Sequence, residues 1–255
     1  MPVELTWRDE FAFITLNRPE ALNALSFQIV REIGAALSEV AESDARAVLF
    51  IGAGEKAFCA GADINELANR SMVETKQSTE AGQRTFARLD TFPIPSVAII
   101  NGYAFGGGFE LASACTFRVA TPNAKMGLPE IKLGLIPGYG GTQRLPRLVG
   151  EARALEIIMT GRTVGAEEAE RIGMINRIIE GDPLEGGIAF AREFSGYSLP
   201  VLGLARDAVK RALGTPVDEG LKVEADLNTL SFQTEDSVEG TEAFLAKRKP
   251  VFSDG

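Results

Sequence analysis

The sequence has no histidine and only two cysteines among its 255 residues. Without an imidazole, the chain cannot build a Ser–His or Cys–His catalytic pair, or a metal site that needs a histidine ligand. Cys59 and Cys115 are too few for a four-cysteine zinc site or a disulfide framework, so we expect reduced, buried thiols of an intracellular protein. Proton transfer is left to carboxylates, lysine, tyrosine and cysteine, and no metal is expected.

Positive charge is also scarce, because 26 basic side chains stand against 35 acidic ones and leave a net charge of −9. An acidic protein of this kind is not expected to bind nucleic acid or an anionic membrane, since both require a basic face. A small anionic ligand is still compatible with this charge, because a few local cations and backbone N–H groups are enough to bind it.

Uninterrupted apolar segments of membrane-spanning length are missing too. The uncharged run at residues 91–109 is broken by two prolines, an asparagine and four glycines, which makes a membrane span a poor interpretation. The first ten residues carry charges and no apolar segment, so no secretory signal is expected. We therefore expect a cytoplasmic protein.

At about 150 residues per domain, the length of the chain corresponds to about 1.7 domains. The apolar pattern that is present predicts an α/β protein. Short runs typical of buried strands cover residues 11–16, 47–51, 96–100, 117–120 and 174–179. Ser26 is expected to cap a helix, because apolar residues follow at helical spacing: Val30, Ile33, Leu37 and Val40. A more polar helix is expected at residues 68–89, with Phe86 and Leu89 as its late apolar anchors.

Beyond residue 183 only helical patterns remain, at residues 184–194, 201–213, 217–232 and 237–247. Glycine and proline separate these segments. We therefore expect an α/β catalytic core at residues 1–195 and an all-helical region at residues 196–255.

A glycine-rich segment at residues 101–110 joins a predicted strand to a helix that is expected to start at Glu110. Such a junction gathers unpaired N–H groups at the positive end of a helix, which suits a phosphate or a developing oxyanion. Neither a P-loop nor a dinucleotide-binding fingerprint fits the spacing. The alternative is that the glycines only make a tight turn.

Two other segments are candidates for chemistry. Pro129 is expected to place Glu130 near a helix start among apolar neighbours, which would raise the pKa of Glu130, whereas the alternative is a solvated surface acid. The segment 57–64 offers small residues after a strand, and its alternative is a close-packed turn with Asp63 as an N-cap. Cys59 within it has no histidine partner and no adjacent cation, so an inert thiol is expected.

Taken together and in this order, these segments resemble the crotonase superfamily, also called the enoyl-CoA hydratase/isomerase family. The resemblance covers nearly the whole chain and is carried by residues 17–25, 57–64, 101–110, 127–130, 136–144 and 232–249. It implies an α/β fold with a crotonase-like spiral core of repeated ββα units. It also implies that the C-terminal helices form trimers and that two trimers make a homohexamer.

The resemblance also implies a site. The backbone N–H groups of Ala62 and Gly107 would polarise the carbonyl of an acyl-CoA thioester, Glu110 would activate water, and Glu130 would protonate Cα. Coenzyme A would be part of the substrate, with no separate cofactor, and would lie across a subunit boundary. Further positions implied in substrate or coenzyme A binding are Arg18, Leu22, Ala24, Lys56, Ala60, Asp63, Ile64, Phe232 and Lys249.

Because both glutamates are present, the resemblance favours hydration of trans-2-enoyl-CoA to 3-hydroxyacyl-CoA in fatty-acid or branched-chain acyl-CoA degradation. A Δ3,Δ2-enoyl-CoA isomerase and a methylglutaconyl-CoA-type hydratase are the alternatives within the family. A catalytically silent acyl-CoA-binding scaffold is the alternative of another class.

Phe105 and Phe109 stand where the family often has smaller residues, so they would shorten the acyl tunnel if they face it. The basic cluster at residues 247–249 is a candidate for contact with the nucleotide end of coenzyme A, and the alternative is a solvated run of charges.

Overall fold

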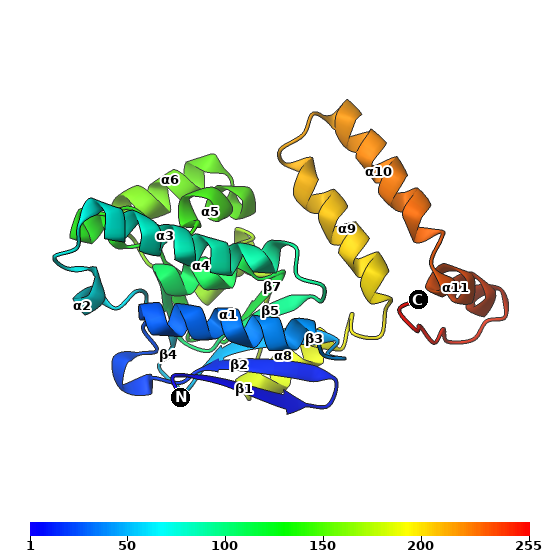
Figure 1. Ribbon diagram of the computed structural model, residues 1–255, viewed down its shortest axis with the longest axis horizontal. Coiled ribbons are helices and arrows are strands. Elements are labelled where there is room, and N and C mark those ends of the chain that lie inside the picture. Colours follow the sequence, from blue (N-terminus) through cyan, green and yellow to red (C-terminus); the bar gives the residue numbers. More distant parts are fainter.

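Two β-sheets with helices on both faces form the core of the computed structural model, which describes all 255 residues (Figure 1). The larger sheet has the order β1 (Val3–Arg8), β2 (Phe11–Leu16), β3 (Ala47–Gly52), β5 (Ser96–Ile100), β7 (Phe117–Ala120) and β10 (Arg177–Ile178). The smaller sheet has the order β4 (Ala57–Cys59), β6 (Tyr103–Phe105), β8 (Lys125–Gly127) and β9 (Val164–Gly165). All neighbouring strands are parallel except the β1–β2 and β8–β9 pairs.

Three consecutive ββ-helix units generate this arrangement. Each unit places its first strand (β3, β5, β7) in the larger sheet and its second strand (β4, β6, β8) in the smaller one. The helices that follow are α2 (Ile64–Leu67) with α3 (Met72–Ala87), then α4 (Gly107–Ala114), and finally the 3₁₀ turn η3 (Glu130–Leu133) with α5 (Gly141–Val149). The expected α/β fold with repeated ββα units is confirmed.

The larger sheet is buried on both faces, which explains why its strands are continuous apolar runs. In β3, Val48 and Phe50 lie in the main apolar cluster, whereas Ala47 and Leu49 lie in a second cluster on the opposite face. Helix α1 (Phe27–Ala41) covers the first face, and α8 (Pro183–Ala191) contributes to the second. The Ser26 hydroxyl accepts the Ile29 N–H as predicted, and the apolar stripe of α1 is buried.

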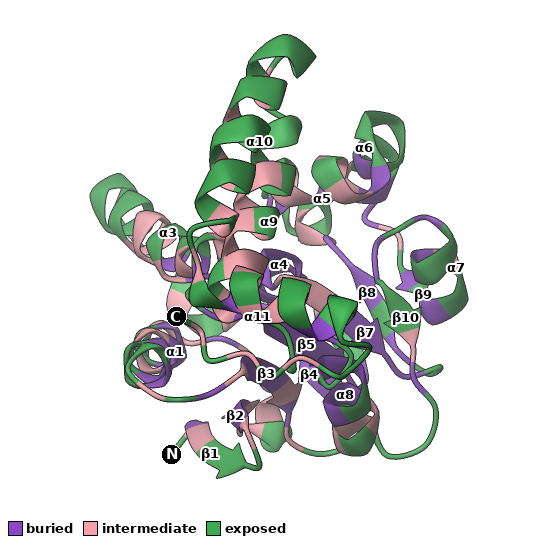
Figure 2. Ribbon diagram, turned by 90° about the vertical axis from the view of Figure 1, so that its right-hand side faces the viewer, coloured by how far each residue is buried: buried purple, intermediate pink, exposed green.

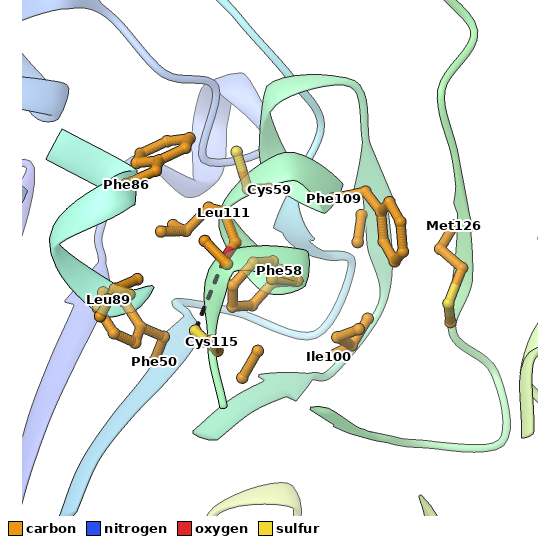
Figure 3. Close-up of a cluster of buried hydrophobic side chains, with 14 of the residues drawn as sticks. Phe50, Phe58, Cys59, Phe86, Leu89, Ile100, Phe109, Leu111, Cys115 and Met126 are labelled. Atoms are coloured by element: carbon orange, nitrogen blue, oxygen red, sulfur yellow. Dashed lines mark hydrogen bonds between the residues drawn. The ribbon is translucent and has the colours of Figure 1, made fainter. Parts of the chain in front are cut away.

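Helix α4 is the most completely enclosed helix of the core, because all eight of its residues are buried. Phe109 lies in the main apolar cluster with Met126 and Ile100 (Figure 3). The helix starts at Gly107, three residues before the predicted start, because Gly106 makes the turn with φ +51°. Gly108 lies so close to β4 that a β-carbon there would overlap the carbonyl oxygen of Cys59.

Two further predicted elements differ from the structure. The helix expected at residues 68–89 begins only at Met72, because Ser71 and Glu74 form a reciprocal capping box, and α2 precedes it as a separate short helix. Phe86 and Leu89 are buried as expected. The strand expected at residues 174–179 is reduced to Arg177–Ile178, although Met174 and Ile175 are buried in the main cluster.

The remaining helices are α6 (Glu151–Thr160), α7 (Ala166–Arg171), α9 (Leu199–Ala212), α10 (Val217–Ser231) and α11 (Glu235–Leu245). The last three extend away from the sheets (Figure 1), and α10 is largely exposed along its length (Figure 2). No residue of α9 or α10 is buried. No helix is long and apolar enough to span a lipid bilayer.

Candidate active site

A cavity of about 750 Å³ opens where the second strands of the three units end. Because β4, β6 and β8 are parallel neighbours, their carboxyl ends lie at one edge of the smaller sheet. The segments that follow these strands contribute Ala62, Gly107 and Glu130 to the cavity wall. The topology therefore explains how three segments far apart in the sequence share one site.

Ala62 and Gly107 lie in the cavity wall where two units meet. A β-carbon built on Gly107 would lie 3.6 Å from the Ala62 nitrogen, so the two residues are in close proximity. Gly107 is the first residue of α4, where a helical N–H has no partner within the helix. The Ala62 N–H donates to no acceptor in the chain, although its neighbour Asp63 donates to the Leu25 carbonyl at 2.8 Å. Both donors are thus free to bind an oxygen atom.

Glu110 lies on the first turns of α4 and is almost fully enclosed, with 2% of its surface exposed. Its Oε1 accepts the backbone N–H groups of Tyr139 at 2.7 Å and Gly141 at 2.8 Å, whereas Oε2 accepts no hydrogen bond. Burial raises the pKa of Glu110 to about 7, and the nearby Glu130 carboxyl adds to the rise. The two N–H donors oppose this shift because they stabilise the ionised form.

Glu130 is the first residue of η3 and directly follows Pro129, as the sequence predicts. Its Oε2 is buried without a hydrogen-bond partner, and burial raises the pKa of the carboxyl. A β-carbon on Gly106 would lie 3.0 Å from Oε1 of Glu130, so glycine at that position leaves room for the carboxyl group. The alternative of a fully solvated surface acid is wrong.

The other predicted contacts divide into those near the cavity and those away from it. Ala60 and Ile64 line the cavity. Arg18 donates to Asp63 Oδ2 at 2.7 Å, and Asp63 also caps α2, so this alternative from the sequence is also realised. Hydrogen bonds from Ala60 N to Leu22 O at 3.0 Å and from Leu25 N to Gly61 O at 2.7 Å hold the loop with Leu22 and Ala24 beside this segment.

Other candidates do not line the cavity within this chain. Lys56, Phe232 and Lys249 are exposed and stand outside its wall. Phe105 stacks on Tyr103 at a centroid distance of 5.7 Å, and Phe109 points into the core, so neither shortens the cavity. The condition for a shortened tunnel is therefore not met, because neither ring lines the cavity and Phe109 is buried in the main apolar cluster.

Both cysteines are buried free thiols, and burial raises the pKa of each to about 12. Cys59 donates to the Gly61 carbonyl at 3.8 Å, and Cys115 donates to the Leu111 carbonyl at 3.6 Å (Figure 3). A nucleophilic role for Cys59 is therefore not supported, as expected.

Sequence reasoning missed Tyr139 as a residue of the site. Its backbone binds Glu110, and its ring packs edge-on against Phe86 at 5.5 Å between centroids. Gly82 of α3 makes room for that ring, because a β-carbon there would lie only 2.4 to 2.8 Å from three ring atoms of Tyr139. Glycines on both sides of Tyr139 were the available signal, since they indicate a turn with exposed N–H groups.

Two backbone N–H groups without an acceptor in the chain and two carboxyl groups with a raised pKa thus line one cavity. A family model described as enoyl-CoA hydratase/isomerase matches residues 8–255, and the chain belongs to this family. The resemblance drawn from the sequence is thereby confirmed.

Curated relatives and solved structures agree with this assignment. The chain is 39% identical to a crotonyl-CoA hydratase of Syntrophomonas wolfei, covering 96% of this chain and 95% of that protein. It is 38% identical to a short-chain-enoyl-CoA hydratase of Clostridium acetobutylicum, covering 93% and 92%. It superposes on the crystal structure of an enoyl-CoA hydratase from Bacillus anthracis with a TM-score of 0.94 and 35% identity, covering 100% of both chains. The expected enzyme class, a hydro-lyase, is confirmed.

Proposed function

We propose that this enzyme hydrates trans-2-enoyl-CoA thioesters to 3-hydroxyacyl-CoA, with Glu110 and Glu130 as its acid/base pair. The observation that carries the proposal is the placement of two carboxyl groups with raised pKa and two free N–H groups around one cavity. Hydration requires a base for water, an acid for Cα and a site for the enolate oxygen, and these groups supply all three.

In this mechanism the thioester oxygen accepts the N–H groups of Ala62 and Gly107. Glu110 takes a proton from water while the hydroxide adds to Cβ, and electron density moves to the thioester oxygen. Glu130 then donates its proton to Cα, and the carbonyl re-forms. Loss of the proton from Glu110 and its regain by Glu130 return the pair to the starting state. The two carboxyls titrate as a coupled unit, so one shared proton defines the active state.

The assignment of the two roles rests on the hydrogen bonds. Two N–H donors stabilise the carboxylate of Glu110, which a base requires. No donor reaches Oε2 of Glu130, and this favours a proton there. Removing one of the two oxyanion donors is expected to raise the barrier by about 3 kcal/mol.

For the complete enzyme we propose a homohexamer of two trimers, in fatty-acid or branched-chain acyl-CoA degradation in the cytoplasm. Exposed apolar side chains on the C-terminal helices support subunit contacts there; they include Val209, Leu213, Val217, Leu221, Leu230 and Phe244. Phe232 and Lys249 stand outside the cavity, which agrees with coenzyme A lying across a subunit boundary. Coenzyme A enters as part of the substrate, and the proposed steps use no other cofactor.

The test is to incubate the enzyme with crotonyl-CoA and with longer and branched enoyl-CoAs. We expect loss of the absorbance of the conjugated thioester and 3-hydroxyacyl-CoA as the product by mass spectrometry. Thioester binding without any hydration across the series would refute the proposal and favour a silent binding protein. Double-bond migration without hydration would instead favour an isomerase.

A further inference from the structure

Arg144 is a largely enclosed cation beside the active site that the proposed mechanism does not use. It lies on α5, and 17% of its side chain is exposed. Its Nη1 donates to the Tyr139 carbonyl at 3.1 Å, and its Nη2 donates to Asp90 Oδ2 at 2.8 Å. One terminal amino group of the guanidinium therefore binds the turn that precedes α5. The other binds Asp90, on the neighbouring 3₁₀ turn η2 (Arg88–Asp90).

The turn that Arg144 contacts is the one that binds Glu110. Tyr139 and Gly141 donate their N–H groups to Glu110 Oε1, while the Tyr139 carbonyl accepts from Arg144. Gly140 between them has φ +115°, and a β-carbon there would overlap Nη1 of Arg144. The turn is thus held by Glu110 on one side and by the guanidinium on the other.

Asp90 fixes Arg144 and also connects it to the C-terminal helices. Lys210 of α9 donates to Asp90 Oδ1 at 2.8 Å and to the Asp90 carbonyl at 3.2 Å. Burial alone would raise the pKa of Asp90, but the hydrogen bonds from Lys210 and Arg144 leave it below its ordinary value. Asp90 is therefore ionised at neutral pH and able to hold both cations. Arg206 of α9 donates nearby to the carbonyl of Phe92, which anchors the same helix to this segment.

We propose that Arg144 is the positioning residue of Glu110, because it holds the turn that orients this carboxylate and places a positive charge near it. The inference rests on the proposed role of Glu110 as the base. The charged groups that face Glu110 are Glu130 from η3 and Arg144 from α5, while Asp90 and Lys210 face Arg144 from η2 and α9. The charges of Glu66, on α2, and of Arg70, in the segment after α2, shift the pKa of Tyr139 in opposite directions.

The experiment compares Arg144→Gln with the conservative Arg144→Lys in crotonyl-CoA hydration. Loss of the cation removes an influence that lowers the pKa of Glu110, so the base ionises at higher pH. We expect Arg144→Gln to lower kcat about 10-fold or more, leave KM nearly unchanged, and move the acidic limb of kcat/KM upward by roughly half a pH unit or more. Arg144→Lys should keep the limb near its wild-type position.

Arg147→Gln is the matched control, because Arg147 lies on the same helix, is exposed, and donates to the Gln143 carbonyl. It should change neither kcat nor the limb. Asp90→Asn is a second variant that leaves the charge of Arg144 but loosens its orientation. We expect it to lower kcat without moving the limb upward, since a negative charge has been removed.

A readout without turnover separates this inference from the proposed function. Difference infrared spectroscopy follows the protonated carboxyl band across pH, and Glu110→Gln assigns the band. A midpoint that rises in Arg144→Gln supports the positioning role, even if the wild type hydrates no enoyl-CoA and the proposed function fails. An unchanged midpoint and an unchanged limb would overturn the inference, including the case in which kcat falls only because the variant is less stable.

Discussion

Glu110 and Glu130 carry the same functional group, and their surroundings set them apart. Two backbone N–H groups bind one oxygen of Glu110, whereas Oε2 of Glu130 is buried without a donor. Both carboxyls have a raised pKa because burial disfavours the charged form. Pairs of titratable groups whose hydrogen bonds favour opposite protonation states are suited to a divided acid and base role.

Replacing either glutamate by glutamine should stop proton transfer and leave the backbone donors in place. We expect Glu110→Gln and Glu130→Gln each to lower kcat by at least about 100-fold, while affinity for the thioester product is retained. Steady-state kinetics and calorimetric binding measure the two effects. Glu167→Gln, at an exposed position on α7, is the control and should behave as wild type. A variant of Glu110 with near-normal hydration would exclude it as the base.

The same substitution of Glu110 should change the pH dependence of stability. Burial raises the pKa of Glu110 from an ordinary 4.5 to about 7, so folding favours the protonated form. The stabilising effect of this proton is fully present below pH 4.5 and is lost as pH rises through 7. As pH rises from 4.5 to 7, the free energy of unfolding of Glu110→Gln should therefore increase relative to that of the wild type, by as much as about 3 kcal/mol. Thermal unfolding at pH 5 and pH 8 checks this, and an equal difference at both would contradict it.

At the scale of elements, the position of α4 depends on the missing side chain of Gly108. A β-carbon there would overlap the Cys59 carbonyl, so Gly108→Ala must push α4 away from β4 and with it Gly107 and Glu110. We expect a loss of about 2 kcal/mol or more in stability and a marked fall in kcat. Gly34→Ala on α1 is the control, because its β-carbon would meet Thr85 at an ordinary 3.7 Å. Chemical denaturation and kinetics on both variants decide the question.

Most strands of the larger sheet and the C-terminal helices could be predicted from the sequence, since buried parallel strands and amphipathic helices have distinct apolar periods. The α1 stripe after Ser26 and the run of β3 are examples. The short strands of the smaller sheet, β4, β6, β8 and β9, were not predicted from these periods. The start of α4 could not be predicted, because the positive φ of Gly106 reflects packing on Gly127 and Glu130 from another unit. Tyr139 was missed for a different reason, because its role lies in a backbone N–H group that the side-chain type does not reveal.

At the scale of the whole molecule, the exposed apolar side chains of α9 to α11 remain unaccounted for in a single chain. We expect the wild type to sediment as a six-chain assembly and Leu221→Asp combined with Leu230→Asp to sediment as a smaller species, because charge is placed on exposed apolar positions of α10. Asp226→Asn on the same helix is the control and should leave the assembly intact. A wild type that sediments as a monomer would contradict the proposed hexamer.

Because the chain has no histidine, few of its side chains exchange protons around neutral pH outside the active site. Both thiols have a pKa shifted to about 12, whereas that of Glu110 lies at about 7. Filling the cavity with a thioester removes water from this carboxyl, so ligand binding should draw protons from the buffer. Titration calorimetry in buffers of different ionisation enthalpy would then report the proton count of the Glu110–Glu130 pair with little contribution from other side chains. In Glu110→Gln the heat of binding should depend less on the buffer, because only Glu130 of the coupled pair still titrates.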